Sequence, residues 1–362
     1  MKVCGVIAEF NPFHYGHKYQ LDNISADIKI AVISPDFVQR GDAGILNQKD
    51  KAKIALKMGY DIVVSIPTKY AIQNAEVFCT YACRILETLK VDTQVFGAET
   101  DDIDKIYKIM GKLENSILLG HLKSGFSYNK SCELALGNLS YLYTSNNILA
   151  MEYLRAIKKY NLHFKPLIIK RKDVGYNSES VIGNITSATN IRKKIYNGED
   201  ISSYIPYDSK YIYNINYENK LYSLFKYIIL TRKIENIYDL NQDILNKLKK
   251  EVKKAKDYNT FLKLMSSRNI SINRIKRLML NIVIDIKVDD INKEEEIEYI
   301  KVIGINSKGA KYIKNIEKAI VNFKNIKDAT ENKFRELYNY LFDSYHFTNT
   351  IYYESGEDVH TR

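Results

Sequence analysis

The sequence predicts an α/β protein whose N-terminal half forms a parallel sheet and whose C-terminal half is mostly helical. Residues 1 to about 195 alternate short β-branched runs with helical stretches, which is typical of parallel strands joined by crossover helices. From about residue 201, glycine becomes rare and apolar residues recur at spacings of three and four, which indicates helices with one buried face. The chain of 362 residues is long enough for two domains, and we expect them at 1–200 and 201–362.

Five β-branched runs are the expected strands. They are Val3 to Ala8, Ile28 to Ile33, Ile62 to Ile66, Thr93 to Phe96, and Phe164 to Ile169. After the first run the chain turns through Asn11-Pro12 and is expected to enter a helix near Gly16. Residues 50–59 are expected to form a helix that ends at a glycine.

In the second half, the apolar spacing of LYSLFKYIIL and INRIKRLMLNIVI predicts amphipathic helices. The chain carries a net charge of +11, and residues 241–280 hold eleven Lys and Arg against three Asp and Glu. A local basic excess is typical of a surface that binds phosphates, although a solvated helix face has the same composition. The charge therefore predicts a surface and leaves its partner open.

Composition also argues against several classes of protein. No window approaches the ~18 uninterrupted apolar residues of a membrane span, and the N-terminus lacks the small-residue cleavage site of a signal peptide, so we expect a cytoplasmic protein. The cysteines Cys4, Cys79, Cys83 and Cys132 lack the spacing of a zinc site. They are expected to be buried thiols.

A tetrapeptide just after the first strand carries the first indication of chemistry. Imidazole donors at His14 and His17 and the backbone N–H groups of a helix N-terminus could bind phosphates together, with Gly16 allowing close approach. Two nearby histidines are also common as surface or core residues. Their position favours the first interpretation, because a doubly wound sheet places its nucleotide crevice there.

The stretch ITSATNIRKK (residues 185–194) is a second such segment, in which a Ser/Thr-rich turn runs into a helix carrying Arg192. Such a turn can cap the helix and hold a phosphate, or simply cap a helix with basic residues outside. The tetrapeptide His14-Tyr15-Gly16-His17 has the pattern HxGH. Together with it, the S-A-T-x-I-R segment resembles the second signature of the HxGH nucleotidyltransferase superfamily.

Four further motifs make the resemblance specific. They are FVQRG (37–41), FGAE (96–99), NNILAMEYL (146–154) and KRKDVGYN (170–177). With the opening EFNPFHYGH, the chain resembles the bacterial tRNA(Met) cytidine acetate ligase family throughout its N-terminal half, and more weakly in RIKRLML and YIKVIGINSKGAKYI. It departs from the family at Ser34-Pro35-Asp36, where S-G-N is usual, and we assign Asp36 no role.

The resemblance implies a Rossmann-like HxGH fold and a two-step reaction. Acetate and ATP form acetyl-adenylate and pyrophosphate, and the acetyl group then passes to N4 of the wobble cytidine, position 34 of elongator tRNA(Met). Mg²⁺ is expected with ATP, held mainly through phosphate oxygens, so no protein metal ligand is named. No membrane and no obligate protein partner is implied.

The resemblance also implies site residues. His14 and His17 are assigned to the phosphates, Arg171 and Arg192 to triphosphate or pyrophosphate charge, and Gly97 to the adenosine, with His14, His17 and Arg192 as the catalytic residues. The residues expected to bind ATP are Ile7, Ala8, Glu9, Phe10, Asn11, Pro12, Phe13, His14, Tyr15, Gly16, His17, Lys18, Tyr19, Gln20, Gly97, Asn146 and Arg171. Asn147 is an alternative to Asn146, because the two are adjacent. The residues expected to bind tRNA are Lys249, Lys250, Lys253, Lys254, Arg274 and Arg277.

Two other functions remain compatible with the motifs. One is an adenylyltransferase for a small molecule such as a nicotinate nucleotide or phosphopantetheine, although the basic helical half is poorly explained by a small substrate. The other is a non-catalytic tRNA-binding protein, which the intact His14, His17 and Arg192 argue against.

Overall fold

The computed structural model describes most of the chain. The described residues are 1–114, 116–126, 128–171, 183–209, 217–267, 269–292, 296–320, 328–342, 351–353 and 358–359. The segment 172–177 of the KRKDVGYN motif lies outside them. Within these ranges, no helix is both long enough and apolar enough to cross a membrane.

The five expected strands are all present and parallel, with ends within two residues of those predicted. They are β1 (Val3–Ala8), β2 (Ile28–Ile33), β3 (Ile62–Ser65), β4 (Thr93–Ala98) and β5 (Lys165–Lys170). They lie side by side in the order β5-β4-β1-β2-β3. Because the order reverses between β1 and β4, the carboxyl ends of these two strands border the crevice where such sheets bind ligands.

Strands from the C-terminal half extend this sheet. They are β6 (Ile300–Ile305), β7 (Ala319–Ile320), β8 (Ile351–Tyr353) and β9 (Asp358–Val359). Strand β6 pairs antiparallel with β3, with Val63 opposite Gly304, so the sheet is mixed rather than wholly parallel. The α/β fold is confirmed. The division at residue 200 stays a prediction, since part of the second half completes the sheet of the first.

Helices cover both faces of the sheet. They are α1 (Tyr15–Asp22), α2 (Gln48–Met58), the short α3 (Thr68–Ala71), α4 (Ala75–Thr88) and α8 (Ser145–Lys159). Alternate residues of the strands separate two cores: Val6 packs with Leu21 and Leu56 of α1 and α2, whereas Ile7 packs with Phe78 and Met151 of α4 and α8. All four cysteines are buried free thiols, as expected.

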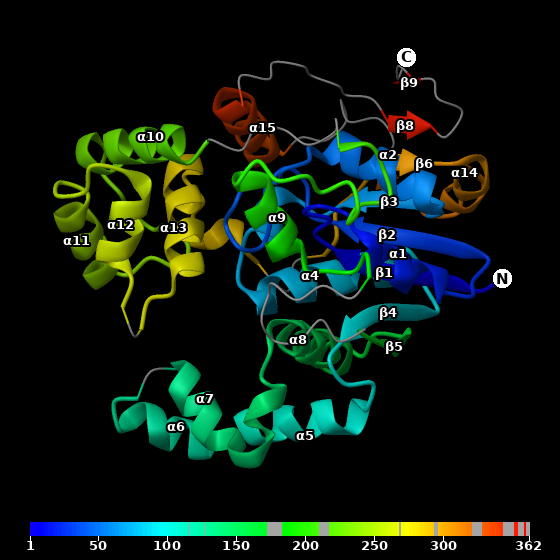
Figure 1. Ribbon diagram of the computed structural model, residues 1–362, viewed down its shortest axis with the longest axis horizontal. Helices are drawn as coiled ribbons and strands as arrows, with labels where there is room; N and C mark the ends of the chain where they lie inside the picture. Colours follow the sequence, from blue (N-terminus) through cyan, green and yellow to red (C-terminus); the bar gives the residue numbers. More distant parts are fainter. Residues whose placement is uncertain are drawn as a thin grey trace.

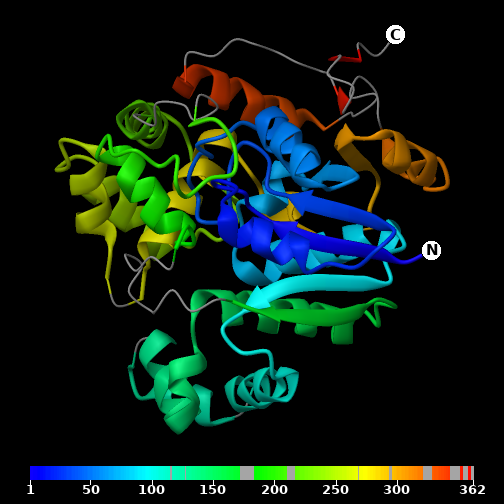
Figure 2. The same cartoon turned by 45° about the vertical axis from the view of Figure 1, so that its right-hand side comes forward.

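The remaining helices form groups outside the sheet. They are α5 (Ile103–Leu113), α6 (Ser116–Lys123), α7 (Tyr128–Leu136) with the 3-10 turn η1 (Gly137–Leu142), α9 (Ala188–Tyr196), α10 (Glu218–Thr231), α11 (Gln242–Glu251), α12 (Tyr258–Met265), α13 (Ile272–Ile284) with η3 (Val288–Asp290), α14 (Ser307–Ile313) and α15 (Ala329–Phe342). Figures 1 and 2 show the bundle α10–α13 on the left and the start of β1 on the right. The carboxyl end of β1 therefore points toward the bundle.

The bundle is continuous with the sheet through its apolar core. Phe225 of α10 and Leu278 of α13 belong to the same buried cluster as Val32 of β2 and Phe334 of α15. A shared core of this kind limits independent movement of the two parts. The bundle is therefore held in place beside the carboxyl edge of the sheet.

Candidate active site

The loop from β1 to α1 has a backbone that fixes its side chains. Phe10 has φ of 46°, and the Asn11-Pro12 peptide is cis. The Asn11 side-chain oxygen accepts a hydrogen bond of 2.9 Å from the Ile45 N–H. Phe10 and Phe13 are buried, and their ring centroids lie 5.1 and 5.4 Å from that of His17. These two residues of the expected ATP segment therefore support the histidines from within the core.

Both histidines use the same ring nitrogen to hold the backbone. The Gly16 N–H donates to Nδ1 of His14 at 3.0 Å, and the His14 N–H donates to Nδ1 of His17 at 3.2 Å, which forms a capping box at the start of α1. A ring nitrogen that accepts carries no proton, so these bonds assign the neutral Nε2–H tautomer to each ring. Each imidazole then has one donor left, Nε2–H, for a ligand.

The surroundings keep both imidazoles neutral. Burial, with added repulsion from His17, Arg171 and Arg192, lowers the pKa of His14 well below its usual value. Burial and the nearby Arg171 lower the pKa of His17 to about 3. The ring centroids of the pair are only 3.9 Å apart, a spacing that two positive rings would oppose. The site thus offers uncharged N–H donors beside fixed guanidinium charges.

Gly16 and the first N–H groups of α1 serve the protein itself. A Cβ on Gly16 would lie 2.7 Å from Cε1 of His14, so glycine makes room for the histidine ring. The Tyr15 N–H donates to the Tyr204 carbonyl, and the His17 N–H to the His14 carbonyl. Our expectation that these N–H groups contact phosphate is therefore not supported here, because each already has a partner inside the protein.

A second group of site residues lies at the ends of β4 and β5. The side chain of Arg171 lies over Gly97, where a Cβ would meet its Cγ at 3.4 Å. Glu99 accepts hydrogen bonds of 2.7 Å from Thr144 and from the Asn146 amide. Burial lowers the pKa of Arg171, and the negative charge of Glu99 opposes this shift. Gly97, Asn146 and Arg171 therefore lie close together. Arg171 is also near enough to His14 and His17 to contribute to the lowered pKa of each.

The two adjacent asparagines differ in their burial and in their hydrogen-bond partners. Asn147 is fully buried; its oxygen accepts from the Glu99 N–H at 3.0 Å, and its amide donates to the Leu142 carbonyl at 2.9 Å. Asn146 is only partly buried and contacts Glu99. Asn147 is thus committed to holding the chain, whereas Asn146 keeps acceptor capacity for a ligand.

Arg192 reaches the same crevice from α9. This helix begins as expected, with Ser187 as N-cap accepting from the Asn190 N–H. The Arg192 guanidinium donates to the Asn11 carbonyl at 2.7 Å and to the Thr189 hydroxyl at 3.2 Å. A residue 181 positions away is thus fixed to the histidine loop.

Other members of the expected ATP segment point to structural partners. Lys18 pairs with Asp22, and the Gln20 amide donates to the Val95 carbonyl at 3.3 Å. Glu9 accepts from the Gln39 N–H at 2.9 Å and so ties the histidine loop to the FVQRG loop. These contacts explain how the segment is held, without assigning each residue to a ligand.

Asp36, at the departure from the family pattern, has a structural position. Its carboxylate accepts a hydrogen bond of 2.7 Å from the Gln48 N–H at the start of α2. Burial raises its pKa, against the pull of nearby cations that include Lys51. The buried Lys51 ammonium donates to the Ser34 and Pro35 carbonyls, and burial lowers its pKa to about 8.

The expected tRNA-binding residues fall in two places. Lys249 and Lys250 on α11, with Lys253 and Lys254 in the turn after it, are exposed. Figure 1 shows α11 on the outer side of the bundle and α13 on its inner side. The six residues therefore do not form a single row along one helix.

The two arginines on α13 have other neighbours. Arg274 forms a two-pronged ion pair with Asp239, at 3.0 and 2.7 Å. The backbone nitrogen of Arg277 lies directly beneath Gly41 of the FVQRG loop. Arg274 is therefore already neutralised, and the basic surface depends mainly on the lysines.

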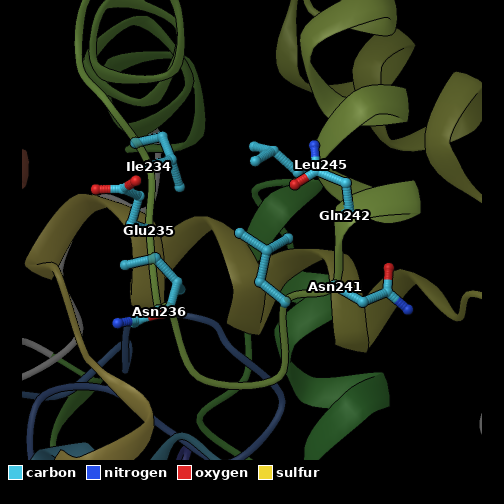
Figure 3. Close-up of a pocket in the computed structure, with 8 residues that line it drawn as sticks. Ile234, Glu235, Asn236, Asn241, Gln242 and Leu245 are labelled. Atoms are coloured by element: carbon cyan, nitrogen blue, oxygen red, sulfur yellow. The ribbon is translucent and has the colours of Figure 1, made fainter.

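A separate hollow lies in the bundle, between α10 and α11. It has a volume of about 350 Å³ and is lined by Ile234, Glu235, Asn236, Ile237, Asn241 and Gln242, among others (Figure 3). None of the residues predicted from the sequence lines it. The Asn241 oxygen is occupied as the N-cap of α11.

Sequence reasoning missed two residues of the site, although it quoted the motifs that contain them. Glu99, the last residue of FGAE, connects Thr144, Asn146 and Arg171. Arg40 of FVQRG lies close enough to Arg192 to lower its pKa, after burial and against the opposite effect of Glu9. Glu99 directly follows β4, and Arg40 lies in the loop after β2. These positions at the carboxyl ends of parallel strands could have indicated that both residues belong to the site.

Comparisons with known proteins agree with this geometry. A family model described as HIGH Nucleotidyl Transferase matches residues 1–359. The chain is 35% identical over 351 residues to the tRNA(Met) cytidine acetate ligase of Thermoanaerobacter sp. (strain X514), covering 88% of this chain and 86% of the relative. It is 32% identical over 373 residues to that of Fusobacterium nucleatum, covering 93% of each. The crystal structure of Thermotoga maritima TmcAL bound with alpha-thio ATP is similar with a TM-score of 0.80 and 25% identity, covering 95% of this chain and 96% of that one.

Proposed function

The chain belongs to the HIGH nucleotidyl transferase family and, within it, to the tRNA(Met) cytidine acetate ligases, and we propose that it is an ATP-dependent ligase that acetylates N4 of cytidine 34 in elongator tRNA(Met). The observation that carries the proposal is the pair of neutral imidazoles, each with one free Nε2–H, which lie near Arg171 and Arg192 at the switch point of the sheet. A partly enclosed array of neutral imidazole donors beside two guanidinium groups fits a triphosphate.

In the first step, an acetate oxygen attacks the α-phosphorus of ATP. A bond from phosphorus to the acetate oxygen forms, and the bond to the bridging oxygen breaks, so pyrophosphate leaves. Negative charge then grows on the α-phosphate oxygens and on the leaving group. His14 and His17 donate hydrogen bonds to the phosphates, while Arg171 and Arg192 stabilise the triphosphate and the departing pyrophosphate, so catalysis is mainly positioning and charge stabilisation.

The adenosine is placed beside β4. Gly97 leaves room beneath Arg171, and the partly buried Asn146 lies beside it with acceptor capacity that Asn147 lacks. We therefore assign the ligand contact to Asn146 and a supporting role to Asn147. Glu99 holds Asn146 by a hydrogen bond and lies near Arg171, whose charge it favours against the effect of burial.

In the second step, the exocyclic amine of the cytidine attacks the acetyl carbon of the adenylate. The carbon–nitrogen bond forms, the carbon–oxygen bond to AMP breaks, and the amine loses a proton. The base must leave its stack to reach the adenylate, which is least costly in a single-stranded anticodon loop. The exposed lysines of α11 and the turn after it are the proposed contacts to tRNA phosphates, with Arg277 nearer the site.

Two further assignments accompany the proposal. Mg²⁺ would enter with ATP, held mainly by phosphate oxygens, and we assign it no protein ligand. A cytoplasmic location follows from the substrates, because ATP and tRNA are present there. The division into a catalytic part, 1–200, and a tRNA-binding part, 201–362, is proposed on the same basis.

The test measures the two steps separately. The purified protein is incubated with ATP and labelled pyrophosphate, with and without acetate, and tRNA(Met) nucleosides are then analysed by mass spectrometry. We expect acetate-dependent exchange and formation of N4-acetylcytidine. Exchange that requires a nicotinate nucleotide or a phosphopantetheine would instead indicate a small-molecule adenylyltransferase. Tight tRNA binding with no exchange under any condition would indicate a non-catalytic binding protein.

A further inference from the structure

The FVQRG loop has a defined shape that presents Arg40 near its tip. Phe37 and Ala43 form an antiparallel bridge, and the Val38 N–H donates to the Asp42 carbonyl at 2.9 Å. The Gly41 N–H returns to the Val38 carbonyl at 2.9 Å, and Gly41 has φ of 80°, a left-handed conformation that glycine adopts without strain. Arg40 therefore lies in a tight turn that is closed by two backbone hydrogen bonds.

This loop is held between the nucleotide site and the bundle. On the site side, the Gln39 N–H donates to Glu9, next to the histidine loop. On the bundle side, Asp42 and Lys276 of α13 form an ion pair of 2.7 Å. A Cβ on Gly41 would lie 2.7 Å from the Arg277 backbone nitrogen, so the loop touches α13 directly. The turn is thus a fixed link between the adenylate site and the helix that faces it.

Arg40 is the unsatisfied cation of this link. It is partly buried, and within the described part of the chain its guanidinium has no hydrogen-bond or ion-pair partner. The two carboxylates nearest in the loop contacts are already used, Glu9 by Gln39 and Asp42 by Lys276. Arg40 also lies near the guanidinium of Arg192, and two neighbouring cations repel each other unless an anion lies between them. The free guanidinium N–H donors of Arg40 are suited to an anionic ligand such as a phosphate.

The position of Arg40 distinguishes between two phosphates. Arg192 is fixed to the histidine loop through the Asn11 carbonyl, whereas the turn that carries Arg40 is fixed to α13 through Asp42 and Lys276. The residues that follow Arg40 contact α13 directly, Gly41 at the Arg277 backbone and Asp42 through its ion pair with Lys276, so Arg40 lies where the site meets the bundle. A phosphate there belongs to a ligand arriving along the bundle rather than to the triphosphate between the histidines.

We propose that Arg40 binds a backbone phosphate of the tRNA beside the nucleotide that is acetylated, and so positions its base at the adenylate. This inference rests on the proposed function. It makes Arg40 a residue of the second step only. The ion pair between Asp42 and Lys276 keeps the turn in place for that contact, because it joins the loop to the bundle that carries the rest of the tRNA.

The test compares Arg40→Gln and Arg40→Lys with Lys57→Gln, which removes the same charge from an exposed position near the C-terminal end of α2, at the opposite edge of the sheet. For Arg40→Gln we expect acetate-dependent exchange without tRNA to stay within about twofold of wild type. We expect kcat/KM for tRNA to fall about 10-fold or more, mainly through KM, and the salt dependence of binding to weaken by about one phosphate contact. Arg40→Lys should recover part of the loss, and Lys57→Gln should behave as wild type.

Two results would overturn the inference. A parallel fall of exchange in Arg40→Gln would place Arg40 at the triphosphate, and unchanged kinetics in both steps would show that it binds no ligand phosphate. Absence of exchange in the wild-type protein is distinguishable from both, since it would refute the proposed function and with it the inference.

Discussion

The histidine site and the basic bundle contrast in how their charged groups are held. At the site, side chains from the start of α1, from α8 and from α9 are held by hydrogen bonds to the backbone: His14 to Gly16, His17 to His14, Arg192 to Asn11 and Asn147 to Glu99. In the bundle, the side chains of Lys249, Lys250, Lys253 and Lys254 are exposed, and Arg274 is neutralised by its ion pair with Asp239. The first arrangement suits a small ligand held at defined atoms, and the second suits a long polyanion.

The two kinds of site should therefore fail in different ways. Removing one donor from a rigid, buried array abolishes a defined contact in the transition state and costs a large factor in rate. Removing one exposed lysine changes the number of released counterions and costs a moderate factor in affinity that depends on salt. Each of the four predictions below tests one side of this contrast.

The largest effect is expected from His17→Ala. Loss of its Nε2–H donor should reduce acetate-dependent pyrophosphate exchange by about 10²- to 10³-fold. Affinity for tRNA, measured by filter binding, should remain within a factor of about two, because His17 is not on the basic surface. His163→Ala is the matched control, since His163 is highly exposed and lies elsewhere. Loss of tRNA binding together with exchange would mean that His17 only supports the fold.

The next effect is expected in the bundle. Replacing Lys249, Lys250, Lys253 and Lys254 by Gln should weaken tRNA binding about 10-fold or more at low salt and make the salt slope less negative by about 3. Lys254 pairs with Glu251 at 3.0 Å, so its share should be the smallest. Exchange without tRNA should be unchanged. An unaltered salt slope would show that the tRNA binds a different face, and an equal loss of exchange would remove the contrast between the two regions.

The same contrast explains what could be predicted from the sequence. Motifs that require a particular backbone conformation allowed the local structure to be predicted. The strand before His14, the turn at Asn11-Pro12 and the Ser187 cap before Arg192 are all present. These features depend on neighbours in sequence, so local chemistry is sufficient to infer them. The composition of the second half predicted helices and a charged surface. It did not indicate which Lys and Arg side chains are neutralised by ion pairs inside the protein.

What remained hidden depends on distant partners. Ile300–Ile305 is apolar enough for a helix or a strand, and only its pairing with β3, more than 230 residues earlier, decides for a strand. Arg274 and Lys249 look equivalent in sequence, yet Asp239 neutralises the first. The use of Nδ1 of both histidines as backbone acceptors likewise becomes visible only when the capping box is formed.

A smaller, paired effect is expected from the two asparagines at the start of α8. Asn147→Ala should lower the free energy of unfolding by about 1–3 kcal/mol, because the Glu99 N–H and the Leu142 carbonyl lose a buried partner. Asn146→Ala should leave the urea midpoint nearly unchanged and raise KM for ATP by about 3- to 10-fold. The reverse pattern would exchange the roles of the two residues and show that buried, bonded side chains at this site also contact the ligand.

The smallest effect on activity is expected from pH. The pKa of His17 is about 3 and that of His14 is well below its usual value, so both rings stay neutral across about pH 5.5–8 and kcat/KM for ATP should show no histidine inflection there. Stability should respond instead. In the unfolded chain each ring binds a proton below about pH 6.5, so the unfolded state takes up more protons and stability falls as pH drops toward the folded pKa.

Urea denaturation at pH 7.5 and 5.5 measures this loss, which should reach about 1 kcal/mol for each buried neutral ring at the lower pH. His17→Asn, which offers an oxygen to the His14 N–H but has no titrating ring, should lose less stability than wild type between the two values. An inflection in kcat/KM near pH 6.5 that His17→Asn removes would show that His17 works as a charged group. The site would then resemble the basic bundle in relying on positive charge, and the contrast between neutral donors and exposed cations would be wrong.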